Sequence, residues 1–436
     1  MREKAGLRTL VLPRDIVSVA IGFEIGPTLG TTALVLNDPV RGLLDTGELG
    51  EKNSFVTVTD DVRSITIERG AQRIDSPVIR YEAGHGMVTL DNASRDYDPE
   101  NLNGPYVAAG VSQVIPTRPI VISASYGGTD YRLITAYIDN WDLDWNGDNW
   151  AQVAVLFTDG FGILSQTDRT AVAPVGLGED TGARIARILD TTDWPSADRD
   201  IDTGDATLLA TTLEGPALEE LQLAADSEIG ELYINGSGVL VFRNRSAIFD
   251  DVRSNTSQAT FGDGGGSELF YMHNGAKFST DRETLYNKVI AQRIGGNEIT
   301  VNDGASQGAH RIKTWTKTDL ILEDDAQVTD YANFILQLSK DPENRFTELV
   351  IKPFRDPDTL FPQVLGREIG DRITVIRRPP GGGDPIERDC FIRGIKHEIS
   401  ISDWTTTFVL QSATKYVFFT LDDAIKGVLD QNALGF

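Results

Sequence analysis

The sequence is poor in cysteine: its 436 residues contain one, Cys390. A lone cysteine has no partner within the chain, which excludes a disulfide-stapled secreted fold and a zinc site built from cysteines, and favours synthesis in a reducing cytoplasm. Long apolar runs are also missing. No stretch approaches the roughly 18 consecutive apolar residues of a membrane-spanning helix, and the first residues lack the apolar centre of a signal peptide. We therefore expect a globular protein without a membrane-inserted segment.

Basic residues are scarce relative to acidic ones. Forty Lys and Arg residues oppose 65 Asp and Glu residues, for a formal net charge of -25. A protein that grips nucleic acid needs clustered Lys and Arg against the phosphates, so this balance argues against such binding. An acidic surface instead repels DNA and keeps a concentrated assembly subunit in solution.

Motifs that carry catalysis are missing as well. None of the four histidines stands in a metal-binding spacing such as His-Glu-x-x-His, and His397 alternates with Ile395 and Ile399 in the manner of a packed strand residue. No Gly-x-Ser-x-Gly elbow and no Walker loop occurs, and the glycine runs 262–266 and 381–383 lack the Lys-Ser/Thr of a phosphate loop. The sequence therefore predicts no catalytic residues, no cofactor and no enzymatic activity.

One acidic segment has the spacing of a calcium-binding loop. Alternating oxygen-bearing side chains, with Gly147 at the sharp turn, match the first half of such a loop: Asp142, Asp144, Asn146 and Asp148. The twelfth position is Val153, where a bidentate Glu is expected, and strands instead of helices flank the segment. A solvated hairpin turn is therefore the preferred interpretation, with calcium as the weaker alternative.

Length and periodicity predict several domains. At about 150 residues per domain the chain suggests about three, and its 42 glycines suggest many tight turns and much β-structure. Alternating apolar residues predict a first β-barrel domain over 51–165. The residues before it, 1–50, are expected to form an extended N-terminal arm with a strand or two. The strands expected in the first β-domain include 120–126, 133–141 and 150–157.

A small α/β domain is expected over 166–262. Apolar residues at helical spacing predict helices at 183–189 and 218–229, the second behind Pro216, which is suited to open a helix. Two strands follow around Asn235-Gly236, a strong hairpin signal. The glycine-rich residues 261–267 mark the end of this domain.

The remaining residues predict a second β-barrel domain interrupted by a helix. Strand patterns occupy 263–300 and 346–415, the latter including separate strands at 389–395 and 397–401. Between them, 301–345 is a helix-containing insertion in which 325–339 has apolar residues at helical spacing. Residues 416–436 are expected to form a C-terminal tail helix. The expected fold class is mainly β with α+β insertions: two similar β-barrel domains, a small α/β domain and a helical insertion.

The two β-rich regions can be laid over one another. In each, a strand is followed by a glycine turn, a second strand and a third, and an aromatic residue of the second strand stands 13 residues before a tryptophan at the third. The matched positions are Ile120 with Ile373, Tyr137 with Phe391, and Trp150 with Trp404. Two unrelated hairpin pairs remain the alternative to a duplication, because alternating strands often match by chance. If the duplication holds, three chains present six similar units, which adapts a three-fold body to a six-fold partner.

Short motifs recur along both β-regions. They lie at 82–84, 88–92, 97–99, 104–106, 118–121 and 126–128, and then at 369–375, 394–399 and 404–406. The first set resembles minor tail proteins of long-tailed (siphovirus-type) phages that infect actinobacteria. The second set resembles the closing barrel of phage baseplate hubs, a group that includes the N-terminal hub module of tail-associated lysins. The residues that carry this structural family motif are Gly84, Asp91, Asn92, Asp98, Pro99, Pro105, Gly370, Asp371, His397 and Trp404.

The resemblance implies a structural virion protein with two tube-type β-barrels per chain. It implies a homotrimeric baseplate hub at the phage tail tip, assembled in the host cytoplasm, that joins the six-fold tail tube and distal tail protein to the three-fold tip. The implied partners are the distal tail protein, the tape measure protein and further tail-tip proteins. Genomic DNA would pass through its channel during ejection without specific binding.

Other functions stay open at the level of the sequence. The nearest is a hexameric distal tail protein. A carbohydrate- or receptor-binding tail module is second, because exposed tryptophans among Trp141, Trp145 and Trp150 could stack on sugars. A cell-wall hydrolase is third, and a turbidity-clearing assay that showed lysis would favour it.

Overall fold

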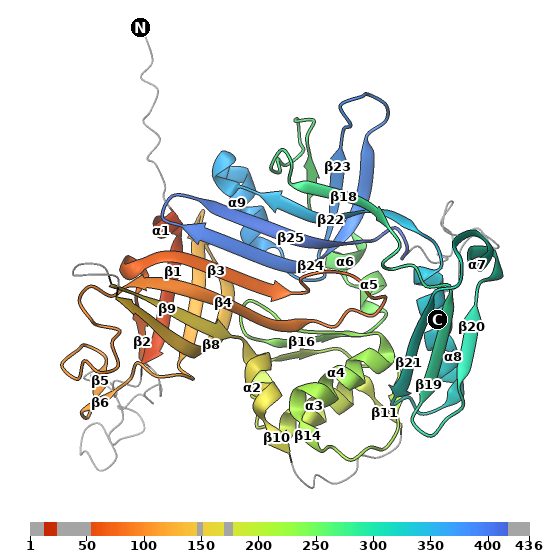
Figure 1. Cartoon of the computed structure of the whole chain (residues 1–436), viewed down its shortest axis with the longest axis horizontal. Helices are drawn as coiled ribbons and strands as arrows, with labels where there is room; N and C mark the ends of the chain where they lie inside the picture. The colour runs from red at the N-terminus through yellow and green to blue at the C-terminus, as the bar shows by residue number, and fades with distance from the viewer. Residues whose placement is uncertain (1–12, 24–53, 146–150, 170–177, 417–436) are drawn as a thin grey trace. The chain divides into compact units, whose positions relative to one another are not determined.

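A computed structural model describes residues 13–23, 54–145, 151–169 and 178–416. The chain divides into two compact units. The first comprises residues up to 67, 85–159 and 397–405, and the second comprises 68–84, 160–396 and the residues from 406 onward. Strands dominate both units, so the prediction of a mainly β fold with α+β insertions is confirmed (Figure 1). None of the described helices is long and apolar enough to cross a membrane.

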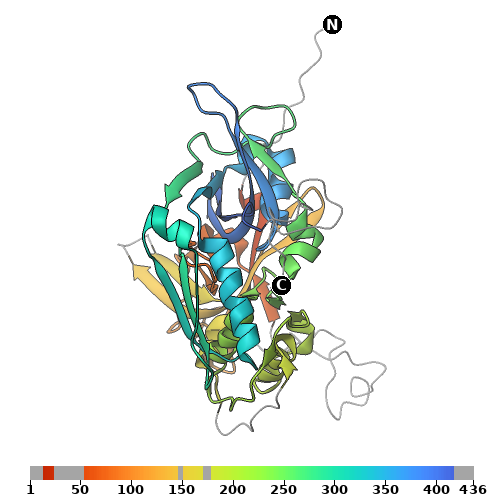
Figure 2. The same cartoon turned by 90° about the vertical axis from the view of Figure 1, so that its right-hand side faces the viewer.

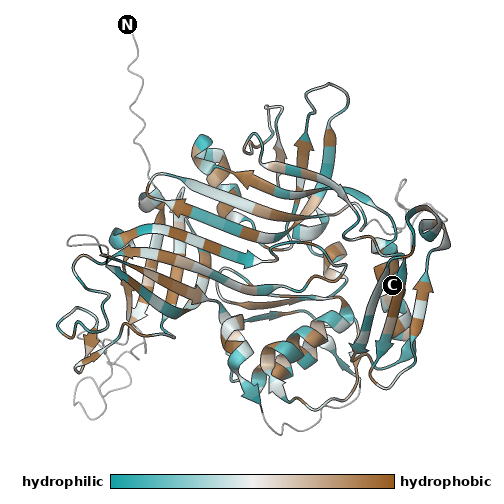
Figure 3. Cartoon of the chain, in the orientation of Figure 1, coloured by the Kyte–Doolittle hydropathy of each residue, from teal (hydrophilic) through white to brown (hydrophobic). Residues whose placement is uncertain are grey.

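The first unit is built on an antiparallel sheet, in which the strands follow the order β3-β4-β9-β8-β7-β1-β2. Hydrophobic and hydrophilic residues alternate along its strands (Figure 3), and in β9 the buried residues are Val153, Val155 and Phe157. Successive side chains of a strand point to opposite faces, so this alternation buries one face of the sheet. The strands are β1 (Val17–Phe23), β2 (Ser54–Thr57), β3 (Val62–Gly70), β4 (Glu82–Asp91), β7 (Pro119–Tyr126), β8 (Thr129–Trp145) and β9 (Ala151–Thr158). The shorter elements are α1 (Pro13–Ile16), η1 (Thr59–Asp61), β5 (Val107–Ala108) and β6 (Val111–Ser112).

A two-residue turn joins β7 to β8. Tyr126 pairs with Thr129 at its base, and the two glycines between them, Gly127 and Gly128, have φ of 59° and 81°. Both central residues of a type I′ turn need positive φ, which glycine adopts without a steric clash. The glycine pair predicted as a turn therefore forms a tight hairpin.

Another series of paired strands, which lies mainly in the second unit, has the order β18-β22-β25-β24-β23-β17. All neighbouring pairs whose register is known are antiparallel except β17 with β23, which is parallel. The strands are β17 (Thr260–Gly262), β18 (Ala276–Asp281), β22 (Glu343–Ile351), β23 (Arg372–Arg377), β24 (Ile386–Ser400) and β25 (Trp404–Ser412).

Two series of strands repeat one strand order. The series β3-β4-β9-β8-β7 matches the series β18-β22-β25-β24-β23, and the last three strands of each series are consecutive in the chain. The pairing also agrees, because Tyr137 lies opposite Pro119 and Phe391 lies opposite Arg372. Pro119 directly precedes Ile120, and Arg372 directly precedes Ile373. These two isoleucines are the residues that the sequence comparison matched. The repeated topology therefore supports the duplication inferred from the sequence.

The prediction of separate strands at 389–395 and 397–401 is wrong, because β24 runs unbroken from Ile386 to Ser400. The predicted break falls at 396, which lies inside this strand, and Gly394 serves a close approach of two backbones. A Cβ at this position would collide with the carbonyl oxygen of Ala71, and the Ala71 N–H donates to the Arg393 carbonyl at 2.8 Å.

The α/β part of the second unit contains the two predicted helices, α3 (Thr181–Asp190) and α4 (Ala217–Glu228). The Asp180 side chain caps α3 by accepting a hydrogen bond from the Ala183 N–H at 2.9 Å. The predicted hairpin around Asn235 is formed by β15 (Glu231–Ile234) and β16 (Leu240–Arg243). The remaining elements of this part are α2 (Gly160–Gln166), β10 (Asp168–Arg169), β11 (Glu179–Asp180), η2 (Ser196–Asp198), β12 (Arg199–Ile201), β13 (Thr207–Leu208), β14 (Gly215–Pro216), α5 (Ala247–Asp250) and α6 (Val252–Asn255).

The chain between β18 and β22 forms a small α/β layer, in which a helix packs on a three-stranded sheet. Its helix α8 spans Asp325–Ser339, the same residues that the sequence predicted. The helix runs along one face of the three-stranded sheet β20-β19-β21 (Figure 2), where Val328, Tyr331 and Ile335 join Val289 and Ala291 in one apolar core. The other elements are β19 (Lys288–Arg293), β20 (Ile299–Asn302), α7 (Gly304–His310) and β21 (Thr314–Leu320).

One helix of ten residues was not expected from the sequence. After η3 (Pro353–Arg355), α9 (Pro357–Gly366) contains Pro362 in its interior. Because proline removes a helical hydrogen bond, the sequence around Pro362 favours a loop over a helix. The helix forms because Leu360, Phe361 and Val364 are buried.

Candidate functional site

The motif residues of the first unit shape the loop that follows β4. The fully buried Asn92 accepts a hydrogen bond from the Tyr97 N–H at 3.0 Å. Asp98 accepts one from the Glu100 N–H at 2.9 Å and another from Arg95 Nε at 2.9 Å. Asp91 pairs with Arg63 and accepts from the Ala93 N–H, and these contacts lower the pKa of its carboxyl. These carboxylates and the amide thus hold a loop in place.

Aromatic rings pack beneath this loop. Phe23 stacks on Tyr106 with ring centroids 4.0 Å apart, and Tyr97 and Trp141 lie beside them. The Tyr97 hydroxyl donates to Asp61 at 2.6 Å, and burial raises the pKa of Tyr97. Pro99 is half-buried in the same loop, whereas Pro105 is exposed.

Two of the three tryptophans considered for sugar stacking lie in the described part of the chain, and they differ in exposure. Trp141 is buried, and its indole N–H donates to the Ile115 carbonyl at 3.0 Å. Trp145 is 58% exposed. Trp150 lies outside the described residues. Of the two described tryptophans, only Trp145 presents its ring to solvent.

The motif residues of the second unit lie around the turn before β23. Asp371 is 1% exposed and pairs with Arg253 and, at 3.5 Å, with Arg367. Gly370 has φ of 93°, and its carbonyl accepts a hydrogen bond from the Ser254 hydroxyl at 3.1 Å. The turn is therefore tied to α6. Gly84, on β4, belongs to the second unit as well and is buried.

The last two motif residues contact each other in the first unit. His397 and Trp404 are both buried, and the Trp404 indole N–H lies 3.4 Å from His397 Nδ1. Their rings meet edge to face at 5.9 Å. The interpretation of His397 as a packed strand residue is confirmed.

The acidic candidate for calcium is only partly described. Asp142 and Asp144 are exposed on β8, and Asn140 donates to Asp142 Oδ1 at 2.6 Å. Asn146 and Asp148 lie outside the described residues. Within the described part of the chain, no three His, Cys, Asp or Glu side chains are arranged to hold a metal ion.

A buried ionic network that sequence reasoning missed lies in the second unit. Arg393 is fully buried, and its Nη1 donates to Glu231 Oε2 at 2.6 Å while its Nε donates to Gln411 Oε1 at 2.7 Å. The Tyr81 hydroxyl also donates to Glu231, at 3.1 Å. The network joins β24, β15, β25 and the segment before β4. The one sequence signal is an arginine inside the apolar run around 390–395.

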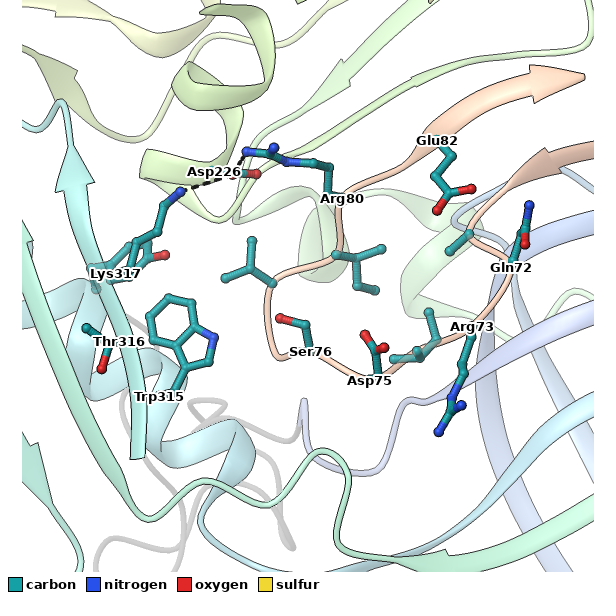
Figure 4. Close-up of a pocket in the computed structure, with 15 residues that line it drawn as sticks. Gln72, Arg73, Asp75, Ser76, Arg80, Glu82, Asp226, Trp315, Thr316 and Lys317 are labelled. Atoms are coloured by element: carbon teal, nitrogen blue, oxygen red, sulfur yellow. Dashed lines mark hydrogen bonds and ion pairs between the residues drawn. The ribbon is translucent and has the colours of Figure 1, made fainter. Parts of the chain in front are cut away.

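A pocket of about 560 Å³ lies in the second unit (Figure 4). The segment between β3 and β4 forms one wall, and β21 supplies Trp315, Thr316 and Lys317 on the other. Asp226, at the end of α4, pairs with both Arg80 and Lys317, the latter at 3.4 Å. Tyr331 of α8 completes the lining. None of these residues belongs to the family motif.

No protein-family model and no curated protein matches the chain. Among the solved structures that resemble its fold are two tail proteins. The 43 kDa tail protein of prophage MuSo2 from Shewanella oneidensis aligns with a TM-score of 0.51 and 15% identity over 82% of this chain and 95% of that one. The tail protein from Neisseria meningitidis MC58 aligns with a TM-score of 0.53 and 13% identity over 90% of this chain and 96% of that one. The chain therefore shares its fold with solved tail proteins, one of them from a prophage.

Proposed function

We propose that the chain is a structural virion protein of a phage tail, and more specifically a baseplate hub subunit at the tail tip. The fold it shares with two tail proteins supports the first part of the proposal. The motifs at 369–375 and 394–399 support the hub assignment, because there the sequence resembles the closing barrel of baseplate hubs. The motif residues support a structural role, since those with described contacts hold turns and loops.

The repeated strand order is the observation that carries the proposal. A chain with two similar antiparallel sets offers two similar surfaces. Three such chains arranged around a three-fold axis present six, so a homotrimer matches a six-fold tube on one side and a three-fold tip on the other. The partners on the two sides are the distal tail protein and tail tube, and the further tail-tip proteins with the tape measure protein.

Charge supports a channel through which DNA passes. The net charge of -25 repels phosphate, so a lumen lined by these acids lets the genome slide without specific binding. This mechanism requires acidic side chains to face the lumen. A net basic lumen would contradict it.

Copy number tests the proposal. Native mass spectrometry of the purified protein and the symmetry of assembled tails in electron-microscope images both count the subunits. Three copies at the tail tip are expected. Six copies would instead favour a hexameric distal tail protein, and a stable monomer absent from the tail would overturn the structural assignment.

A further inference from the structure

The pocket between β21 and the segment 71–82 contains a buried polar group that lacks a partner. Tyr331 is 1% exposed, and its hydroxyl makes no hydrogen bond within the described part of the chain. Burial raises the pKa of this hydroxyl, so it keeps its proton and remains a donor. A buried hydroxyl without a partner costs free energy, which a ligand that bonds to it would recover.

An aromatic ring stands beside that hydroxyl. Trp315 is partly exposed, and its ring centroid lies 5.9 Å from that of Tyr331. Its indole faces Ser76 across the pocket (Figure 4). The ring therefore offers an apolar surface, and its N–H offers a further donor, to whatever enters the pocket.

The charges that line the pocket balance. Three basic side chains face three acidic ones: Arg73, Arg80, Lys317, Asp75, Glu82 and Asp226. The Asp226 carboxylate lies between two of the cations. A balanced set of this kind gives no net attraction for an anion or a cation, but it provides both donors and acceptors for hydroxyl groups. The volume lies within the range of about 300 to 1,000 Å³ found for small-molecule sites.

We propose that this pocket binds a neutral saccharide of one or two rings. The sugar ring packs on the indole of Trp315, and its hydroxyls bond to the Tyr331 hydroxyl and to the Arg80–Asp226–Lys317 group. This site goes beyond the proposed hub function and does not depend on the number of subunits in the assembly.

Saturation-transfer NMR on the purified full chain tests the proposal with four probes: glucose, N-acetylglucosamine, maltose and chitobiose. At least one is expected to bind with a dissociation constant in the millimolar range. Trp315→Ala should weaken that binding about tenfold, through loss of the stacking surface. Trp145→Ala is the matched control, because Trp145 is an exposed tryptophan in the other unit and should leave binding unchanged.

Tyr331→Phe separates binding from folding. It removes only a hydroxyl that lacks a partner, so the melting temperature should stay the same or rise while saccharide affinity falls. Absence of transfer to all four probes would overturn the proposal. So would loss of binding in Trp145→Ala alone, or glucose 6-phosphate binding much more tightly than glucose, since the latter indicates an anion site.

Discussion

Some charged side chains of this chain are buried at positions where the sequence pattern suggests only apolar packing. Arg393 lies in an apolar run of β24 and is fully buried, yet its guanidinium is paired with Glu231 and bonded to Gln411. Glu228 at the end of α4 is 1% exposed and accepts hydrogen bonds from the N–H groups of Ala206 and Arg245. Each side chain is tolerated because its partners come from other segments of the second unit.

Replacement of Arg393 by methionine should destabilise the protein strongly. Arg393→Met keeps an unbranched side chain but leaves Glu231 without its buried cation, a change that costs about 3 to 5 kcal/mol. Urea denaturation measures the loss. Arg187→Met is the control, because the 54% exposed Arg187 also pairs with a glutamate and its loss should cost about 1 kcal/mol or less. Equal losses in the two variants would contradict the role of the network.

Glu228 should make stability depend on pH in a defined direction. Burial, the largest cause, raises the pKa of its carboxyl above the ordinary value of 4.5. The folded state then binds the proton more tightly than the unfolded state, so this group destabilises the protein above its folded pKa. That penalty disappears as the pH falls toward 4.5.

The test compares wild type with Glu228→Gln by urea denaturation at about pH 8 and about pH 5. The wild type should gain stability relative to the variant as the pH falls, because the glutamine cannot titrate. A difference between the two proteins that is the same at both pH values would contradict the prediction.

At the scale of elements, backbone positions matter as much as side chains. Glycines that look alike in the sequence serve different purposes: Gly128 supplies positive φ in the β7–β8 turn, Gly394 lets β24 approach Ala71, and Gly308 does neither within α7. Turn geometry and close approach are properties of strand pairs and neighbouring backbones, which a single segment does not reveal.

Alanine at these three glycines should therefore give three different results in urea denaturation. Gly394→Ala should cost about 3 kcal/mol, because the added Cβ meets a carbonyl oxygen. Gly128→Ala should cost about 1 to 2 kcal/mol for the left-handed backbone. Gly308→Ala should stabilise by about 0.5 to 1 kcal/mol, since open space surrounds it in a helix. A Gly394→Ala variant as stable as wild type would refute the account of β24.

At the scale of the whole molecule, charge and repetition are the properties with consequences. The chain carries 25 more negative than positive charges, and two of its strand series repeat one strand order. The negative charge makes the surface repel phosphate. The repeated strand order sets how many equivalent surfaces an assembly presents. Both belong to the proposed role as a subunit of a DNA-conducting tail.

The charge predicts that the protein does not bind duplex DNA. Fluorescence anisotropy with a labelled duplex at about 50 mM salt should show no association, because few cations are available to replace the counterions of the phosphates. A basic DNA-binding protein measured in parallel serves as the positive control. Association that weakens steeply with added salt would show a basic surface and contradict the prediction.

Local patterns in the sequence were sufficient for much of the fold. Alternation predicted strands such as β7, β8 and β9, helical spacing predicted α8 at Asp325–Ser339, and a spacing of 13 residues suggested the repeat. These features depend on a few consecutive residues, or on intervals that the chain itself records. The sequence also identified the residues that hold the loop after β4, although it did not reveal what each of them contacts.

Other features were decided by the tertiary structure. Burial overrides Pro362 in α9, and the break predicted at 396 lies inside one continuous strand, β24. The partner of Arg393 is 162 residues away along the chain, and the pocket draws Asp226, Trp315 and Tyr331 from three different elements. Side-chain chemistry and local periodicity can be read from the sequence alone. Contacts between distant segments form only when the chain folds, because packing alone brings those segments within bonding distance.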